Sequence, residues 1–251
     1  MRLFITTALL GLLVVSVMQA EDNAAIGGDL GLYSAYVWRG MVFDEKPVLQ
    51  TDLWIEDQGV SMVFWGNCDL TGEGEEFKSR FNEWDVYISF PLKSFNRFTL
   101  GGELDYLSFP SSSGFSGAST AEISGWIASD LPGAPRLQVF WDIWQWHGIY
   151  ANLNLSHVLA LGPGSLALTG AAGWGNDDHN RQSGVPESGG LLDAFIGAAY
   201  DWPAKDWLTI TPAISFTTIL QSDIKDAYES DEIDIDPSRV YFSINAALVK
   251  P

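Results

Sequence analysis

The chain has 251 residues and carries 13 lysines and arginines against 32 aspartates and glutamates, a formal net charge of -19 at pH 7. This acidity excludes the basic surface that a nucleic acid needs, and a content of 47% hydrophobic and only 18% charged residues excludes a disordered acidic tail. The single cysteine, Cys68, excludes an intrachain disulfide and a cysteine metal cluster.

The first residues have the pattern of a secretory signal. Arg2 precedes an apolar run over residues 3–17, and Met18-Gln19-Ala20 places a small residue before Glu21. The run is shorter than the roughly 20 residues of a helical membrane span, which argues against a retained anchor. We therefore expect residues 1–20 to be cleaved after export across the inner membrane, and residues 21–251 to form one domain.

From residue 21 onward the dominant hydrophobic period is two, which predicts β-strands. The clearest example is residues 83–90, where glutamate, aspartate, tyrosine and serine alternate with tryptophan, valine, isoleucine and phenylalanine. About twelve segments of roughly 9–12 residues have this pattern, the length at which a strand crosses a bilayer. They begin near residues 29, 47, 60, 81, 97, 120, 136, 148, 165, 191, 208 and 239.

The connections between these segments alternate in length. Residues 56–59, 91–95, 130–135, 161–164 and 201–206 are short and turn-like, whereas most connections between them are longer and rich in glycine, serine or acidic residues. Outer-membrane barrels are built with short turns on the periplasmic side and long loops on the other. An even number of strands also leaves both chain ends on the short-turn side.

Period alone does not separate a membrane barrel from a soluble periplasmic barrel, because the same alternation is simply inverted between them. The polar face carries very little lysine, which soluble β-proteins use to protect exposed strands. Aromatic residues also gather near strand ends, as in interfacial girdles, although an ordinary aromatic core is the alternative. They are Phe90, Phe95, Phe98, Trp202 and Trp207 near the short turns, and Tyr106, Phe109, Trp146 and Trp174 near the long loops. We predict an all-β fold, an antiparallel up-and-down transmembrane β-barrel of about 12 strands.

Several segments resemble a known family. Residues 33–41, Tyr-Ser-Ala-Tyr-Val-Trp-Arg-Gly-Met, resemble the S-x-Y-x-[FW]-R-G opening of the TorF-type porins, conserved hypothetical proteins of Gram-negative bacteria. Residues 47–53, 59–67, 83–87 and 102–110 are similar to the second to fifth strands of that family. The resemblance implies an outer-membrane barrel and a pore, and it implies no known substrate.

The chain departs from the family in two places. Ala35 stands where the family more often has aspartate, and the chain ends Leu248-Val249-Lys250-Pro251, where family barrels tend to end on an aromatic residue.

If the apolar face meets lipid, the other face lines the lumen and is acidic. The candidate pore-lining or binding residues are Arg39, Asp52, Glu83, Asp85, Glu103, Asp105, Glu122, Asp142, Trp144 and Asp193. Their summed field attracts cations and repels anions. The alternative is that the acids pair with Arg39 and Arg97, or hydrate a plugged interior. Further bulky residues are expected to point inward and to narrow the passage or form an aromatic binding wall: Trp126, Phe140, Tyr150 and Phe195.

Arg39 is expected where the first strand enters its loop, beside Gly40, which permits a sharp turn. Two roles are open for it. It is either a constriction cation among lumenal carboxylates or a residue that only balances a local acidic cluster.

Metal sites are weakly indicated. Residues 226–236 are dense in carboxylates, which suit Ca²⁺, but the glycine and ligand spacing of an EF-hand are absent, so a solvated loop is expected there. Asp177-Asp178-His179 is a second, weaker candidate. We expect no cofactor.

Enzymatic activity is not expected. Ser156 and His157 are adjacent in a predicted strand, so their side chains point to opposite faces and form a poor dyad. No P-loop, Rossmann or zinc-hydrolase motif is present in the sequence.

The sequence therefore predicts an outer-membrane porin-like barrel that allows passive diffusion of small solutes, cations among them. Its partners are outer-membrane lipid and these solutes, and no nucleic acid. A non-conducting barrel that binds a ligand or partner through acidic extracellular loops is the first alternative, and an envelope enzyme at the barrel rim is the second. The solute, the open or plugged state of the lumen and the oligomeric state stay open.

Overall fold

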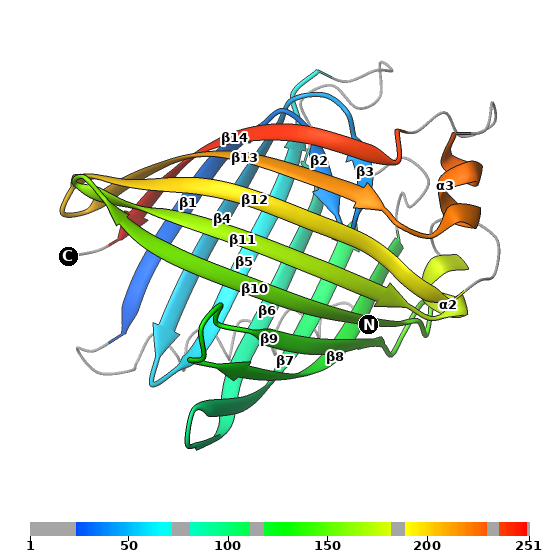
Figure 1. The fold of residues 1–251 in the computed structure, drawn as a ribbon, viewed down its shortest axis with the longest axis horizontal. Helices are drawn as coiled ribbons and strands as arrows, with labels where there is room; N and C mark the ends of the chain where they lie inside the picture. Colours follow the sequence, from blue (N-terminus) through cyan, green and yellow to red (C-terminus); the bar gives the residue numbers. More distant parts are fainter. Residues whose placement is uncertain (1–23, 72–80, 111–117, 182–188, 230–235, 250–251) are drawn as a thin grey trace, which may run out of the picture.

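The computed structural model describes residues 24–71, 81–110, 118–181, 189–229 and 236–249. Within these residues, twelve antiparallel strands form a closed barrel, each hydrogen-bonded to its neighbours along the chain (Figure 1). The predicted signal peptide, residues 1–20, lies outside the described residues.

The barrel strands cover most of the chain. They are β1 (Ala25–Tyr33), β4 (Val48–Asp57), β5 (Val60–Asp69), β6 (Phe81–Phe95), β7 (Phe98–Phe109), β8 (Ala118–Ser129), β9 (Arg136–Asp142), β10 (Ile149–Leu161), β11 (Gly164–Gly175), β12 (Gly190–Lys205), β13 (Leu208–Ile219) and β14 (Ser238–Val249). Every strand except β1 begins within two residues of its predicted start, and β1 begins four residues earlier. The predicted fold class is confirmed.

The first and last strands close the ring. β1 pairs with β14 from Gly27↔Val249 to Tyr33↔Ser243. One residue further, Ser34 donates its backbone N–H to the carbonyl of Phe242 at 2.9 Å, and its Oγ accepts the Phe242 N–H at 2.9 Å. Closure leaves none of the twelve described barrel strands with an unpaired edge, as a barrel in lipid requires.

The barrel is apolar outside and polar inside. Outward residues such as Leu53 and Ile196 are 63% and 62% exposed, whereas Glu83 and Asp105, on the inward faces of their strands, are each 4% exposed. A soluble barrel would bury the apolar set. The inverted arrangement therefore matches a barrel whose outer surface meets lipid.

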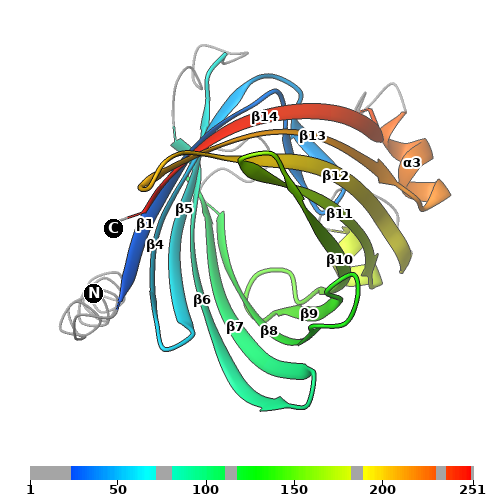
Figure 2. The ribbon, with the colours of Figure 1, turned by 60° about the vertical axis from the view of Figure 1, so that its left-hand side comes forward.

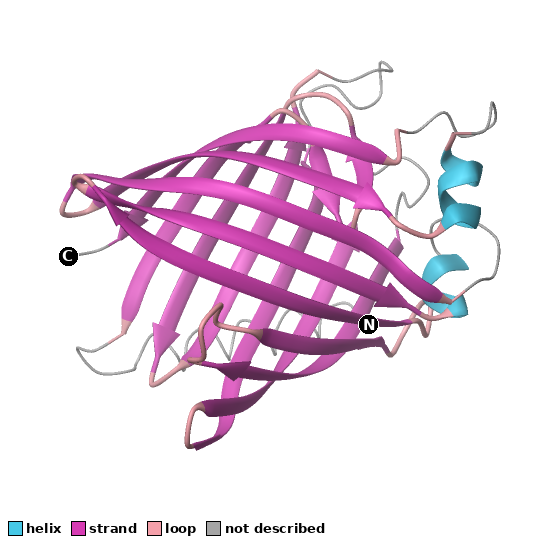
Figure 3. Cartoon of the chain, in the orientation of Figure 1, coloured by secondary structure: helices cyan, strands magenta, loops and turns pink. Residues whose placement is uncertain are grey.

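Turns and long connections are sorted to opposite ends, as predicted. Helices α2 (Asp177–Arg181) and α3 (Ser222–Tyr228) lie in the β11–β12 and β13–β14 connections, at the end of the barrel away from the chain's C-terminus (Figures 1 and 3). Among the described residues, neither helix is long and apolar enough to cross a membrane.

A hairpin inside the first connection was not predicted. β2 (Tyr36–Trp38) and β3 (Met41–Asp44) pair with each other rather than with the barrel, so the expectation that strand one reaches Arg39 is wrong. Ladder pairing of β1 with β4 and β14 stops at Tyr33, which frees the following residues to fold back on themselves. Arg39 and Gly40 form the turn, both with positive φ (48° and 80°). In the turned view of Figure 2, the blue segment of β2 and β3 lies beneath β14 and β13.

The hairpin is anchored by the main apolar cluster. This cluster comprises Met41, Tyr150, Leu192, Ile219, Ile224 and Tyr228, with Trp38, Phe140 and Ala227 packed against it. It joins β3 to α3 and to strands β10, β12 and β13 at the long-loop end. The hairpin is thus held against the inner surface by burial of apolar side chains.

Four of the nine predicted girdle aromatics are exposed on the outer surface: Phe95, Trp174, Trp202 and Trp207. Trp202 and Trp207 are exposed near the short turns, and Trp174 is exposed near the long connections. Phe109 is an exception, because it follows Asp105 and Leu107 on the inward face of β7 and is buried. Its place in the long-loop girdle was therefore wrongly predicted.

Candidate functional site

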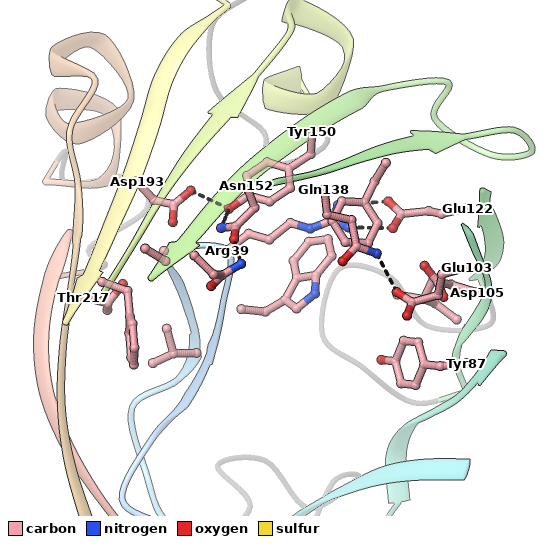
Figure 4. Close-up of a pocket in the computed structure, with 18 of the residues that line it drawn as sticks. Arg39, Tyr87, Glu103, Asp105, Glu122, Gln138, Tyr150, Asn152, Asp193 and Thr217 are labelled. Carbon is pink, nitrogen blue, oxygen red and sulfur yellow. Dashed lines mark hydrogen bonds and ion pairs between the residues drawn. The ribbon is translucent and has the colours of Figure 1, made fainter. Parts of the chain in front are cut away.

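A cavity of about 360 Å³ lies in the lumen, lined by the turn of the β2–β3 hairpin and by inward faces of β6 to β14 (Figure 4). Four of its described lining residues are carboxylates, Glu103, Asp105, Glu122 and Asp193, and one, Arg39, is a guanidinium. The cavity is therefore a place where the acidic inner surface meets the hairpin.

Arg39 spans the lumen and binds the opposite wall. Its Nη1 and Nη2 donate to Oε1 and Oε2 of Glu122 at 2.9 and 2.6 Å, and both side chains are buried. The guanidinium carbon also lies 4.2, 4.7 and 4.5 Å from the ring centroids of Trp38, Phe140 and Tyr150. Bidentate pairing and contact with ring faces are the geometry that a guanidinium favours.

Gly40 fixes the other side of the hairpin turn. A Cβ at this position would lie 2.3 Å from the Cβ of Asp193 on β12, so only glycine fits. Figure 4 shows Arg39 between Asp193 on one side and Glu122 on the other. The turn therefore bridges β8 and β12 across the lumen.

Three carboxylates stand in a row on neighbouring strands. Asp105 on β7 pairs directly with Glu122 on β8, and Glu122 pairs with Asp142 on β9, with Tyr87 next in line on β6. Like charges placed directly opposite each other destabilise a sheet. Each member of the row consequently needs a compensating contact.

Two members of the row have one. Glu122 binds Arg39, and Asp142 accepts the Thr120 hydroxyl at 2.6 Å and the backbone N–H groups of Trp144 and His147 at 3.0 and 3.2 Å. Asp142 thus holds the β9–β10 connection and does not line the cavity. Asp105 differs: within the described part of the chain its buried Oδ1 has no hydrogen-bond partner.

The remaining cavity carboxylates accept neutral donors. Glu103 accepts the Gln138 amide at 2.8 Å, and Asp193 accepts the Tyr150 hydroxyl at 2.9 Å.

Two further predicted residues lie on the β6 wall beyond the cavity. Glu83 accepts the Tyr36 hydroxyl at 2.7 Å, and Asp85 accepts the Tyr87 hydroxyl at 2.5 Å and the Ser108 N–H at 3.3 Å. Asp52 lies on β4 directly opposite Asp29 of β1, and it too is absent from the cavity lining.

Trp144 is not in the lumen, contrary to the prediction. It is 57% exposed, follows the end of β9, and its ring lies 6.3 Å from that of Tyr106. Tyr106 in turn contacts the ring of Trp84 at 5.4 Å on the outer face. The strand alternation stops at Asp142, so extending it to Trp144 assigned the wrong face.

The structure therefore brings together five of the predicted site residues around the cavity: Arg39, Glu103, Asp105, Glu122 and Asp193. Phe140, Tyr150 and Phe195 also line it, as expected of the inward aromatics. The neutral polar residues Gln138, Asn152, Asn154 and Thr217 were missed as site residues. Their inward strand positions were the available signal, but a neutral amide is not conspicuous in a sequence.

The weak metal candidates do not converge. His179 is buried against the rings of Trp38 and Tyr150, and burial, with a smaller effect of Arg39, lowers its pKa well below the usual value. Asp178 binds Arg181 at 3.0 Å, and Asp177 accepts the Gly189 N–H at 2.6 Å. Across the described ranges, no group of three or more histidine, cysteine or acidic side chains is placed to hold a metal ion. Residues 230–235 of the acidic stretch lie outside those ranges.

Comparisons with known proteins show similarity of fold. No protein-family model and no curated protein matches the chain, so membership of the TorF-type family stays a prediction. Among solved structures, NanC porin superposes with a TM-score of 0.55 at 10% identity, covering 90% of this chain and all of NanC. An outer membrane channel, COG4313, from Pseudomonas putida F1 gives a TM-score of 0.49 at 9% identity over 92% of this chain and 97% of that one. The similarity to NanC porin establishes a shared barrel fold.

Proposed function

We propose that the protein is an outer-membrane pore through which small solutes diffuse passively, with cations favoured. The observation that carries the proposal is a lumenal cavity with four carboxylates against one guanidinium, inside a barrel that shares its fold with NanC porin. The TorF-type resemblance of residues 33–41 agrees with this function.

Membrane placement follows from the outer surface. The exposed apolar strand faces, with tryptophans such as Trp174 and Trp202 near opposite ends, suit a bilayer and its interfaces. Export by a signal peptide at residues 1–20 is part of the proposal.

The preference for cations follows from charge. Arg39 is occupied by Glu122, so the summed field of the remaining lumenal carboxylates is negative. Within low-dielectric walls such a field raises the local concentration of cations and lowers that of anions.

The adjacent residues Ser156 and His157 do not suit nucleophilic catalysis, which favours a pore over an enzyme. Ser156 and His157 are consecutive residues of β10, so their side chains point to opposite faces of the barrel wall.

Single-channel conductance of the refolded mature protein in a planar bilayer under a KCl gradient tests the proposal. The expected result is discrete openings whose reversal potential is shifted toward the equilibrium potential of K⁺. A folded and inserted protein that stays silent would overturn the pore. The protein would then be a non-conducting barrel, and its acidic loops would be the place to search for a ligand or partner.

A further inference from the structure

Asp105 is a buried carboxylate with an unmet requirement for a partner. It is 4% exposed, it lines the lumenal cavity, and its Oδ1 has no hydrogen-bond partner among the described residues. A buried carboxylate costs free energy unless it is paired and hydrogen-bonded. Its neighbours across the ladder do not help, because Glu122 is itself acidic and Tyr87 donates its hydroxyl to Asp85.

Glu103 adds a second negative charge beside Asp105. It lies two residues earlier on the same inward face of β7, and it accepts a hydrogen bond from the neutral amide of Gln138. The cavity guanidinium is already engaged, since both of its terminal nitrogens bind Glu122. A further cation in the cavity is therefore stabilised most strongly beside the carboxylates of Asp105 and Glu103.

Arg39 shows what kind of cation this cavity holds. Its guanidinium combines a carboxylate with three aromatic faces, at 4.2 to 4.7 Å from their centroids. The same two elements recur beside Asp105 and Glu103, because Tyr87 lines the cavity from the neighbouring strand β6, and Phe195 adds a second ring from the opposite wall. Aromatic faces attract organic cations and also cover an attached carbon chain.

The size of the cavity selects a small occupant. About 360 Å³ is at the lower end of the range of roughly 300–1,000 Å³ for small-molecule pockets. A bare metal ion is not favoured, because the described residues place no group of three histidine, cysteine or acidic side chains around one point.

We propose that Asp105 and Glu103 form a binding subsite for the ammonium group of a small organic monoamine, whose carbon chain lies against the ring faces of the cavity. The subsite rests on the proposed pore, and it names the class of solute that the pore retains during passage. Arg39, fixed next to it, disfavours a second positive charge on the same solute.

Block of the K⁺ current by n-butylammonium tests the subsite, with n-butanol as the neutral isostere. In the wild type, the amine is expected to produce saturable block and the alcohol none. Asp105→Asn keeps the shape and removes the charge, and it is expected to raise the half-blocking concentration about 10- to 100-fold, the effect of losing a charged hydrogen bond. Glu103→Gln is expected to raise it less.

Asp201→Asn is the matched control. Asp201 lies on β12 toward the short turns and accepts the Thr211 hydroxyl at 2.9 Å, and it does not line the cavity. This variant removes the same charge, and n-butylammonium should block its K⁺ current at the same concentration as in the wild type. Equal loss of block in Asp105→Asn and Asp201→Asn would overturn the subsite in favour of a general field. If Asp105→Asn does not fold, unchanged block in Glu103→Gln would likewise overturn it.

Failure of the pore and failure of the subsite are distinguishable. If the inserted wild-type protein carries no current, titration calorimetry of n-butylammonium chloride into the refolded protein in detergent tests the subsite alone. Heat of binding that disappears in Asp105→Asn supports the subsite without a pore. Absence of heat in the wild type, or equal heat in the variant, overturns it.

Discussion

The two sides of the lumenal cavity differ in charge. The acidic wall is formed by cavity residues of β6 to β9, and three of its seven are carboxylates: Tyr87, Glu103, Asp105, Leu107, Glu122, Gln138 and Phe140. The neutral wall is formed by those of β10 to β14, and one of its eight is a carboxylate: Tyr150, Asn152, Asn154, Ala171, Asp193, Phe195, Thr217 and Tyr241.

The difference separates two ways of making a polar lumen. Amides and hydroxyls on the neutral wall hydrogen-bond one another, as Asn152 does with the Tyr150 hydroxyl at 3.1 Å, and they need no outside partner. Carboxylates on the acidic wall repel each other across the ladder and need cations or N–H groups. The stability of the acidic wall therefore depends on the cation that the hairpin supplies, whereas the polar side chains of the neutral wall satisfy one another.

Removing the hairpin's cation has the largest expected effect. Arg39→Met leaves Glu122 buried and unpaired, and breaking a buried ion pair in this way costs about 3–5 kcal/mol. Urea unfolding of the protein in lipid vesicles measures the loss. The double variant Arg39→Met, Glu122→Gln is expected to recover most of it. An unchanged free energy of unfolding in the single variant would mean that the acidic wall does not need the hairpin.

Loosening the hairpin from the neutral wall is expected to have the next largest effect. Gly40→Val puts a β-branched side chain at φ 80° and against Asp193, which costs about 2–4 kcal/mol from backbone strain and overpacking. A hairpin displaced from the lumen also raises the single-channel conductance. Gly133→Val is the matched control, because Gly133 has φ 85° with its nearest atom 4.0 Å from an added Cβ. It should cost less and leave conductance unchanged; equal effects in both variants contradict the bridging role.

Removing the carboxylate that holds the β9–β10 connection, at the end of the row next to the acidic wall, is expected to have a milder effect. Asp142→Ala deprives the Thr120 hydroxyl and several backbone N–H groups of their acceptor, at a cost of about 1–3 kcal/mol. Asp142→Asn keeps one acceptor oxygen and should lose less. The same unfolding measurement compares them, and an alanine variant as stable as the wild type would show that the β9–β10 connection holds its shape alone.

Adding charge to the neutral wall is expected to change stability least. Asn154→Lys introduces a cation at an exposed lumenal position, with an expected change within about 0.5 kcal/mol. The reversal potential under a KCl gradient should move toward weaker cation preference, while Asn154→Gln leaves it unchanged. A reversal potential insensitive to this lysine would show that the acidic wall alone controls selectivity.

The strands could be predicted because the alternation of polar and apolar residues is visible within each segment. In β7 the alternation of Leu104 and Tyr106 with Glu103 and Asp105 is local, and the structure keeps those two sets on opposite faces. Wherever a strand obeys this period, the residues that share a face can be grouped before the neighbouring strands are known.

The rest depends on distant contacts. The β2–β3 hairpin has a strand-like pattern, and nothing local says that it pairs with itself and enters the lumen. The partner of Arg39 is 83 residues away, and the acceptor role of Asp142 depends on how the chain turns after β9. Trp144 was misplaced for the same reason, because a period has meaning only as far as the ladder continues.

The seam of the barrel, where Ser34 and Phe242 join the first strand to the last, affects the rate of assembly. These residues are 208 positions apart, so the ring shuts only when nearly the whole described chain is in place. Until then the sheet has two open edges that can pair with another chain, and the closing contacts must overcome the entropy of the intervening loop. The slow and hazardous stage of assembly is therefore the last one, and substitutions at this seam should delay insertion more than they weaken the finished barrel.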